Sequence, residues 1–147
     1  MSGPDFVDEP FTRPQPVLTA RTGAFWTSGA DGVLRIARCR RCGRYLHPPG
    51  PVCSGCTGRD IRFEPVSGRG SVWSWTVNRY QWNPSMPPPY VVASVELVEQ
   101  PDLRLLTNLV ECSTDEIRVG MPVEVCFARA GDAHVPLFRP VVDDAER

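Results

Sequence analysis

Four cysteines in two close pairs are the residues of this sequence best suited to chemistry. Each pair has the spacing C-x2-C and ten residues separate the pairs: Cys39 with Cys42, and Cys53 with Cys56. Such a pair fits a tight turn in which both thiolates face one ion, and four thiolates complete the tetrahedral shell that Zn²⁺ prefers. Because no ligand position stays open for water, the spacing predicts one structural zinc ion in a compact ribbon.

Other uses of these thiols are compatible with the spacing. Two disulfides would require an oxidising compartment, and no other feature of the sequence is typical of a secreted protein. A rubredoxin-type iron site is also open, because four thiolates suit iron as well as zinc. His47 follows the first pair by five residues. With four cysteines available, we expect it at the surface or beside the ligands rather than among them.

Bulk composition argues against several classes of protein. The 147 residues carry a net charge of −1 with an isoelectric point near 6.1, so binding of a polyanion by bulk electrostatics is disfavoured and nucleic acid is not the expected partner. The first residues contain no apolar signal segment, and no apolar stretch approaches the roughly eighteen residues of a membrane span. We therefore expect a cytoplasmic protein that does not contact a membrane.

Few side chains here could carry out catalysis. The sixteen basic residues are all arginine, so this chain offers neither a Schiff-base lysine nor a phosphate-loop lysine. His134 lies near a predicted turn and is expected in solvent. Cys112 and Cys126 fall on predicted strands, where packing is the favoured role of a thiol. We accordingly predict no catalytic residue, and expect that the chain is not catalytic by itself.

The elements that must position the cysteines begin after a proline-rich arm, residues 1–18. We expect this arm to be irregular, either disordered or lying across a partner. A short helix is expected over 19–30, with Phe25 and Trp26 as its apolar side, and it opens a unit of helix plus ribbon that extends to residue 66. Strands are expected on either side of the cysteine turns, over 33–38 and 61–66.

From residue 67 to 143 the sequence changes to short alternating segments separated by turn residues. Trp73, Trp75 and Val77 alternate with polar residues, which predicts a strand with these three side chains on a half-buried face. Strands are expected over 71–80, 90–98, 103–110, 123–128 and 135–142, with one helical turn over 113–117. About five strands in so short a stretch predict a small closed barrel, for which the OB-fold is the natural candidate. Residues 144–147 are expected to form a tail.

The segment between the first two barrel strands is unusually rich in proline and in large apolar side chains. It carries Tyr80, Trp82, Met86 and Tyr90 together with four prolines. A stiff loop loses little conformational entropy on docking, and large apolar side chains are favoured at interfaces. We expect these four residues to face a partner or its substrate channel. In the alternative arrangement, Trp82 and Met86 fold back over the end of the barrel.

Taken in order, these motifs resemble the acyl-CoA-associated zinc-ribbon/OB-fold family, long known as a domain of unknown function. The resemblance covers about residues 19–142 and rests on these segments: Phe25-Trp26, 39–43, 48–56, 70–76, 89–93, 105–109 and 120–123. The ribbon by itself is common to many families, whereas ribbon and barrel motifs in this order are much more specific. The implied fold is mainly β, with an N-terminal helix and a rubredoxin-like zinc ribbon before a small OB-fold barrel.

The resemblance also implies a function. Members of the family resemble non-catalytic accessory subunits of thiolase-fold enzymes, in which the partner supplies the chemistry and the small subunit stabilises its CoA and substrate channel. One branch resembles the partner of aldolases, or lyases, of steroid side-chain degradation; another assists thiolase and condensing steps. The all-arginine composition, compatible with a high-GC actinobacterium, favours the steroid branch. The implied assembly is a hetero-oligomer, with a CoA thioester as the substrate of the complex.

Two other functions remain open on the sequence alone. OB barrels bind single-stranded nucleic acid by aromatic stacking, for which Trp73, Trp75 and Trp82 would serve, although the acidic isoelectric point counts against this role. A stand-alone acyl-CoA binder would use arginines near the first cysteine pair as phosphate contacts. The arginines in question, which equally suit a solvated face, are Arg38, Arg40, Arg41 and Arg44.

Overall fold

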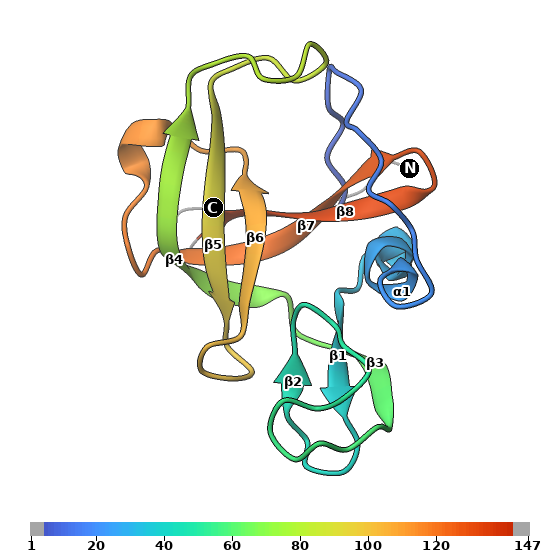
Figure 1. Ribbon diagram of the computed structural model, residues 1–147. Coiled ribbons are helices and arrows are strands. Elements are labelled where there is room, and N and C mark those ends of the chain that lie inside the picture. Colours follow the sequence, from blue (N-terminus) through green and yellow to red (C-terminus); the bar gives the residue numbers. More distant parts are fainter. Residues whose placement is uncertain (1–4, 143–147) are drawn as a thin grey trace.

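The computed structural model describes residues 5–142, which form a small three-stranded sheet and a closed five-stranded barrel (Figure 1). A short helix, α1 (Gly23–Thr27), and a 3₁₀ turn, η1 (Ser28–Asp31), contact strands of both. This arrangement confirms the predicted fold class, mainly β with a ribbon before a barrel. Within the described range, no helix is long and apolar enough to cross a membrane.

The ribbon sheet has the order β2-β1-β3 and is antiparallel throughout. Its strands are β1 (Arg35–Cys39), β2 (Tyr45–Leu46) and β3 (Ile61–Pro65). The sequence did not predict β2, because two residues are too few to show alternation. The turn before it closes when the Gly43 N–H donates to the Cys39 carbonyl at 2.8 Å, with Gly43 at a φ of 82° that favours glycine.

The barrel has the strand order β4-β5-β6-β8-β7. Its strands are β4 (Arg69–Asn78), β5 (Tyr90–Leu97), β6 (Arg104–Leu109), β7 (Pro122–Ala130) and β8 (Ala133–Pro140), with the 3₁₀ turn η2 (Thr114–Glu116) between β6 and β7. All pairings are antiparallel except that of β6 with β8, which meet in parallel at Leu109 and Phe138. Residues of β5 alternate strictly between buried and half-buried, which is the period-two pattern expected of a barrel wall.

One apolar core joins the barrel to the elements before it. Barrel residues such as Val95 and Phe138 are fully buried in the same cluster as Phe25 of α1 and Ile36 of β1. Burial of apolar surface stabilises such a cluster by about 25 cal/mol per Å². The helix and the ribbon are therefore attached to the barrel through a shared core, and their side chains can form a common surface.

The helix is shorter than the predicted range of 19–30. Residues before it form a turn, in which the Thr19 hydroxyl accepts the Thr22 N–H at 3.0 Å and its carbonyl accepts the Gly23 N–H at 2.8 Å. After Thr27 the chain tightens into η1 and stops at Gly32, whose φ of 81° is left-handed. The helix starts late because the Thr19 hydroxyl accepts a backbone N–H in a turn. It ends early because the left-handed Gly32 terminates the helical segment.

The prediction of a half-buried face for Trp73 and Trp75 is wrong. The register of β4 against β5 shifts between Val72 and Ser74, so a bulge adds one residue and changes the alternation. In addition, β7 pairs only with the start of β4, at Arg69–Ser71. Trp73 is 50% exposed and Trp75 is 36% exposed. The Arg104 guanidinium lies 3.7 Å from the centre of the Trp73 ring and partly covers it.

The described part of the N-terminal arm lies along the chain's own barrel, although the sequence predicted either disorder or contact with a partner. Its start pairs with β7: the Val7 N–H donates to the Phe127 carbonyl and the Phe127 N–H donates to the Asp5 carbonyl, both at 2.8 Å. In Figure 1 the arm (dark blue) then rises toward the loop between β4 and β5. Residues 1–4 of the predicted arm and the predicted tail at 144–147 lie outside the described residues.

Candidate metal centre and partner-facing surface

The two cysteine turns bring four sulfur atoms together at the tip of the ribbon. The Sγ atoms of Cys39, Cys42, Cys53 and Cys56 all lie within 4.8 Å of one another. The shortest approaches cross between the turns, at 3.6 Å from Cys39 to Cys56 and 3.6 Å from Cys42 to Cys53. Each turn therefore contributes two thiols to one cluster, at the place where the spacing predicts a metal site.

The sulfur positions fit a tetrahedral ion. With metal–sulfur bonds of about 2.3 Å, a regular tetrahedron has edges of about 3.8 Å, close to the observed 3.6 Å separations. A disulfide requires about 2.05 Å, and none of the four cysteines is bonded to another. The donor set, four thiols with no carboxylate or imidazole among them, is that of a closed structural site.

Backbone N–H groups of the turns point at the sulfur atoms. The N–H groups of Cys56 and Gly55 lie 3.5 and 3.3 Å from Cys53 Sγ and lower the pKa of that thiol to about 6. The backbone N–H groups of Cys42 and Arg41 likewise lower the pKa of Cys39. Donors aimed at sulfur favour the thiolate form, which is the form that binds a metal.

Glycine at position 58 allows the second turn to close around the cluster. A Cβ there would lie 3.2 Å from Cys56 Sγ, 3.3 Å from Cys39 Sγ and 3.3 Å from Arg41 Cδ. The side chain of Arg41 therefore packs across Gly58, directly beside two of the four sulfur atoms. In the same way Arg44 covers Gly55, where a Cβ would approach its Cδ to 3.1 Å.

His47 lies in a different place from the one the sequence predicted. Its ring packs on that of Phe25, with 4.8 Å between centroids, and burial lowers its pKa to about 4. It does not belong to the cysteine cluster. His134 is half-buried rather than solvated, because its ring meets that of Phe6 edge-on at 6.0 Å. Both histidines are thus placed by aromatic packing.

The two remaining cysteines lie away from the ribbon. Cys126 is buried on β7, where desolvation raises the pKa of its thiol to about 12. Cys112 is half-buried in the connection after β6 rather than on a strand, and desolvation raises its pKa as well. Raised pKa values keep both thiols protonated and poorly nucleophilic.

The proline-rich loop divides the predicted interface residues into two pairs. Tyr80 and Trp82 are 65% and 73% exposed, and their rings pack together with 4.6 Å between centroids. The Trp82 indole N–H donates to Asn78 Oδ1 at 2.8 Å, which fixes the ring although it lies in solvent. These two residues form a rigid, exposed aromatic pair, and their role at an interface stays a prediction.

Met86 and Tyr90 are half-buried and lie beside the N-terminal arm. Both line a cavity of about 330 Å³ that the arm closes with Phe11 and Arg13. Met86 also lies beside Pro16 and Trp26 in a neighbouring groove. The alternative arrangement, in which both Trp82 and Met86 fold back over the end of the barrel, agrees with the half-buried Met86 but not with Trp82, which is largely exposed.

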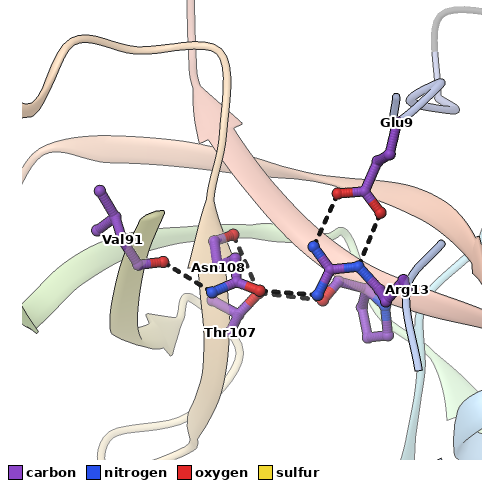
Figure 2. Close-up of polar contacts among 6 residues, drawn as sticks. Glu9, Arg13, Val91, Thr107 and Asn108 are labelled. Atoms are coloured by element: carbon purple, nitrogen blue, oxygen red, sulfur yellow. Dashed lines mark hydrogen bonds and ion pairs between the residues drawn. The ribbon is translucent and has the colours of Figure 1, made fainter. Parts of the chain in front are cut away.

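The arm is held in place by a charged group at its centre (Figure 2). Arg13 makes a two-pronged ion pair with Glu9, at 2.7 and 2.8 Å, and each of these side chains is 10% exposed. A further Arg13 N–H donates to Asn108 Oδ1 at 2.8 Å, and the Asn108 amide donates to the Val91 carbonyl at 2.9 Å. Arm, β5 and β6 are thereby joined by one network.

Sequence reasoning missed an apolar groove between α1, the segment after β2 and the outer face of the barrel. It has a volume of about 450 Å³ and is lined mainly by Phe25, Trp26, His47, Pro48, Val92, Leu106 and Val135. Leu106, at its rim, is 78% exposed. The sequence did contain an indication of this groove. Leu105 and Leu106 are adjacent apolar residues on one strand, so only one of them can face the barrel interior and the other must lie on the outer face.

Comparison with protein families divides the chain in two. Residues 26–62 match the model described as the rubredoxin-like zinc ribbon domain of ChsH2. Residues 63–128 match the model described as the C-terminal OB-fold domain of ChsH2. The division falls within β3, where the ribbon leads into the barrel.

Several curated proteins are similar to the chain. A "Probable enoyl-CoA hydratase alpha subunit" of Thermomonospora curvata is 40% identical over 136 residues, which cover 91% of this chain and 42% of that protein. The "3-oxo-4,17-pregnadiene-20-carboxyl-CoA hydratase alpha subunit" of Mycobacterium tuberculosis is 32% identical, and the match covers 95% of this chain and 43% of that protein. The chain thus spans about two fifths of the length of these two relatives. The "Benzoylsuccinyl-CoA thiolase subunit BbsA" of Thauera aromatica is 31% identical, and the match covers 74% of this chain and 76% of that protein.

Among solved structures, a chain of the "Ltp2-ChsH2(DUF35) aldolase" superposes with a TM-score of 0.77 at 39% sequence identity. The match covers 87% of this chain and all of that one. Both ribbon and barrel are thus found, in the same order and arrangement, in one solved subunit. The chain belongs to the DUF35 family of ChsH2-type proteins, in which a rubredoxin-like zinc ribbon precedes an OB-fold domain.

Proposed function

We propose that this chain is an accessory subunit of a thiolase-fold acyl-CoA enzyme, whose partner supplies the catalytic groups. The observation that carries the proposal is the match over the full length of a subunit in the Ltp2-ChsH2(DUF35) aldolase. The names of the curated relatives support the same role, because they describe subunits of hydratases or thiolases that act on CoA thioesters.

The side chains of this subunit support a non-catalytic role. Its sequence contains no lysine, so an imine mechanism would have to start on the partner. The aromatic packing of His47 and the depressed pKa of its imidazole favour a structural role over acid–base work. In an aldol cleavage, the base that removes the hydroxyl proton and the groups that stabilise the thioester enolate would belong to the partner.

The finer proposal is that the complex is a lyase that cleaves steroid side chains. It is supported by the word aldolase in the name of the solved complex. It is also supported by the steroid CoA thioester in the name of the mycobacterial relative. The substrate of the complex would then be a hydroxyacyl-CoA attached to a steroid, and the products a shorter steroid ketone and a short acyl-CoA.

For the ribbon, we propose one structural zinc ion held by Cys39, Cys42, Cys53 and Cys56. The ion would supply folding free energy to a small sheet that buries few side chains of its own. For the interface, we propose that Tyr80 and Trp82 contact the partner directly. In this arrangement Met86 and Tyr90 support the loop from behind.

The test is co-expression of the chain with a thiolase-like protein encoded beside it, followed by size-exclusion chromatography with mass measurement. We expect a stable hetero-oligomer that cleaves a hydroxyacyl-CoA substrate, with neither chain active alone. A lone monomer beside an independently active partner would contradict the proposal. In that case, salt-dependent binding of a single-stranded oligonucleotide would favour the alternative function, for which the exposed tryptophans Trp73, Trp75 and Trp82 provide stacking surfaces.

A further inference from the structure

The three ribbon strands are attached to the barrel unequally. Ile36 of β1 is fully buried in the apolar core that the ribbon shares with the barrel, and Phe63 of β3 packs against it. β2 contributes only the half-buried Tyr45 to this core, because Leu46 lies in the ribbon's own small cluster beside the cysteines. It has two residues and pairs with β1 at two positions. With so few contacts, β2 is the ribbon strand most easily displaced.

A side-chain amide from the barrel completes the outer edge of β2. The Tyr45 N–H donates to Gln100 Oε1 at 2.8 Å, and Gln100 Nε2 donates to the Tyr45 carbonyl at 3.0 Å, across 55 residues of sequence. Gln100 lies in the turn between β5 and β6. One amide group therefore makes both of the backbone hydrogen bonds that a neighbouring strand would make at this position.

The residue before Gln100 holds the other end of the ribbon. Glu99 Oε2 accepts the N–H of Ser67 at 2.8 Å, and Ser67 lies between the last ribbon strand, β3, and the first barrel strand, β4. The turn is closed by the Leu97 N–H, which donates to the Leu103 carbonyl at 2.9 Å. Adjacent residues of one barrel turn thus hold both the edge strand of the ribbon and its exit. We name Glu99 and Gln100 the turn clasp.

Tyr45 is also linked directly to the first cysteine turn. The Arg38 guanidinium lies 4.5 Å from the centre of the Tyr45 ring and donates to the Gly43 carbonyl at 2.7 Å. The Cys39 N–H donates to the Arg44 carbonyl at 2.9 Å, so the residue next to Tyr45 closes the turn that carries the first two thiols. Because this turn runs straight into β2, the position of the Tyr45 backbone depends on whether the turn is closed.

We propose that the turn clasp couples metal binding in the ribbon to the position of β2 on the barrel. When the cysteine turns close around an ion, the Tyr45 backbone is held where Gln100 can bind it. When the ion is absent, the first turn loosens and Gln100 releases β2. The coupling is reciprocal, since a contact that favours the metal-bound ribbon must raise its metal affinity by the same factor. The inference rests on the proposed structural ion and gives that ion a second role, the positioning of β2.

Release of β2 would also change a surface of the molecule. β2 leads directly into His47 and Pro48, which line the apolar groove together with Val92 and Leu106 of the barrel. The ribbon side of this groove is therefore held in place through β2. We expect it to be ordered when the ribbon holds its metal and to loosen when the metal is removed.

The test compares two glutamines that make the same kind of contact. Gln15 Oε1 accepts the Asp132 N–H at 2.9 Å in the turn between β7 and β8, so Q15A is the matched control for Q100A. Zinc affinity is measured on the full-length chains by competition with a chelator, and metal content is checked by mass spectrometry. We expect Q100A to bind zinc about fivefold more weakly or worse, and Q15A to bind it as the unmodified chain does.

Amide hydrogen exchange of the unmodified chain, followed by NMR, gives a second readout that needs no variant. The Tyr45 N–H, which donates to Gln100, should exchange about fivefold faster or more after metal removal. The Asp132 N–H, which donates to Gln15, should exchange at the same rate in both states. If Q100A does not fold, Gln100→Glu replaces it with the same expectation, because this change removes only the donor to the Tyr45 carbonyl.

Three results would overturn the proposal. Q100A and Q15A could bind zinc equally well, or the Tyr45 N–H could exchange equally with and without metal. Equal acceleration of all barrel amides on metal removal would show global unfolding instead of release at the clasp. A chain that binds no metal would overturn both the structural ion and the clasp, whereas normal metal binding with unchanged Tyr45 exchange would overturn the clasp alone. Neither measurement involves the thiolase-fold partner, so the proposed accessory function stands or fails separately.

Discussion

Arg13 on the N-terminal arm donates a hydrogen bond to Asn108 of β6 at 2.8 Å, across 95 residues of sequence (Figure 2). The same guanidinium is neutralised by Glu9, and both charged side chains are nearly buried. A buried ion pair whose remaining donors are satisfied is hard to break one partner at a time. The arm is consequently a fixed part of the barrel surface, and it sets the position of the loop that carries Tyr80 and Trp82.

Replacement of Arg13 by alanine should therefore destabilise the protein strongly. The change leaves the Glu9 carboxylate buried without a partner and removes the donor to Asn108, so we expect a loss of about 3 kcal/mol in the free energy of unfolding. Urea unfolding monitored by circular dichroism measures this loss. Arg62→Ala is the matched control, because its ion pair with Asp60 is exposed and should contribute less than about 1 kcal/mol. Equal effects of the two substitutions would show that the arm is not held by this network.

Cys39→Ser should remove one ligand from the four-cysteine site. We expect loss of bound zinc and a marked fall in thermal stability, because a closed site with three thiolates binds metal much more weakly. Elemental analysis by mass spectrometry gives the metal content and also distinguishes zinc from iron. Cys112→Ser, outside the cluster, should retain the full content. Full occupancy in Cys39→Ser would mean that the site is formed differently.

Gly58→Ala tests the close packing around the sulfur atoms. Its Cβ would lie 3.2–3.3 Å from two Sγ atoms that a bound zinc ion would hold in place, so we expect weaker zinc retention against a chelator and a loss of about 1 kcal/mol in stability. Gly23→Ala provides a control, because nothing lies within 4 Å of its Cβ. Helix propensity predicts that this control is neutral or stabilised by up to about 1 kcal/mol. Identical chelator kinetics in both variants would contradict the packing argument.

The two sides of the proline-rich loop should respond differently to truncation. Trp82→Ala removes an exposed ring, so we expect unchanged stability of the chain but at least tenfold weaker assembly with the partner. Met86→Ala removes a half-buried side chain beneath the arm and should cost about 1–2 kcal/mol of stability. Unfolding curves and binding titrations on both variants separate these effects. Normal assembly of Trp82→Ala would exclude this residue from the interface without affecting the family assignment.

The half-buried imidazole of His47 predicts a specific acid sensitivity. The unfolded chain binds a proton below a pKa of about 6.5, whereas the folded chain resists until about 4. Protonation therefore favours the unfolded state as the pH falls through this window, and the free energy of unfolding should drop by about 2–3 kcal/mol between pH 6.5 and pH 4. His47→Phe keeps the ring packing against Phe25 without the titrating group. The stability of this variant relative to the unmodified protein should rise as the pH falls. If the free energies of unfolding of the two proteins changed in parallel with pH, His47 would not be the group that causes the acid sensitivity.

Local chemistry in the sequence was sufficient for much of the fold. The C-x2-C spacing allows little except two sharp turns around one ion, so the four sulfur atoms had to converge wherever the ribbon lies. Strict alternation, as in residues 90–98, likewise predicts a strand with one buried face. Such features depend on neighbours within a few residues, and short-range geometry is what a sequence pattern encodes directly.

Other features were decided by contacts between distant segments. The bulge in β4 that exposes Trp73 depends on its pairing with β5, and the position of the arm depends on Asn108, which follows it by 95 residues. His47 became neutral and half-buried because Phe25 lies against it in the folded chain. The sequence alone determined the cysteine turns, the five barrel strands and the family. Tertiary structure decided which aromatic side chains stay in water and which arginines are paired, because exposure and pairing are properties of the assembled surface.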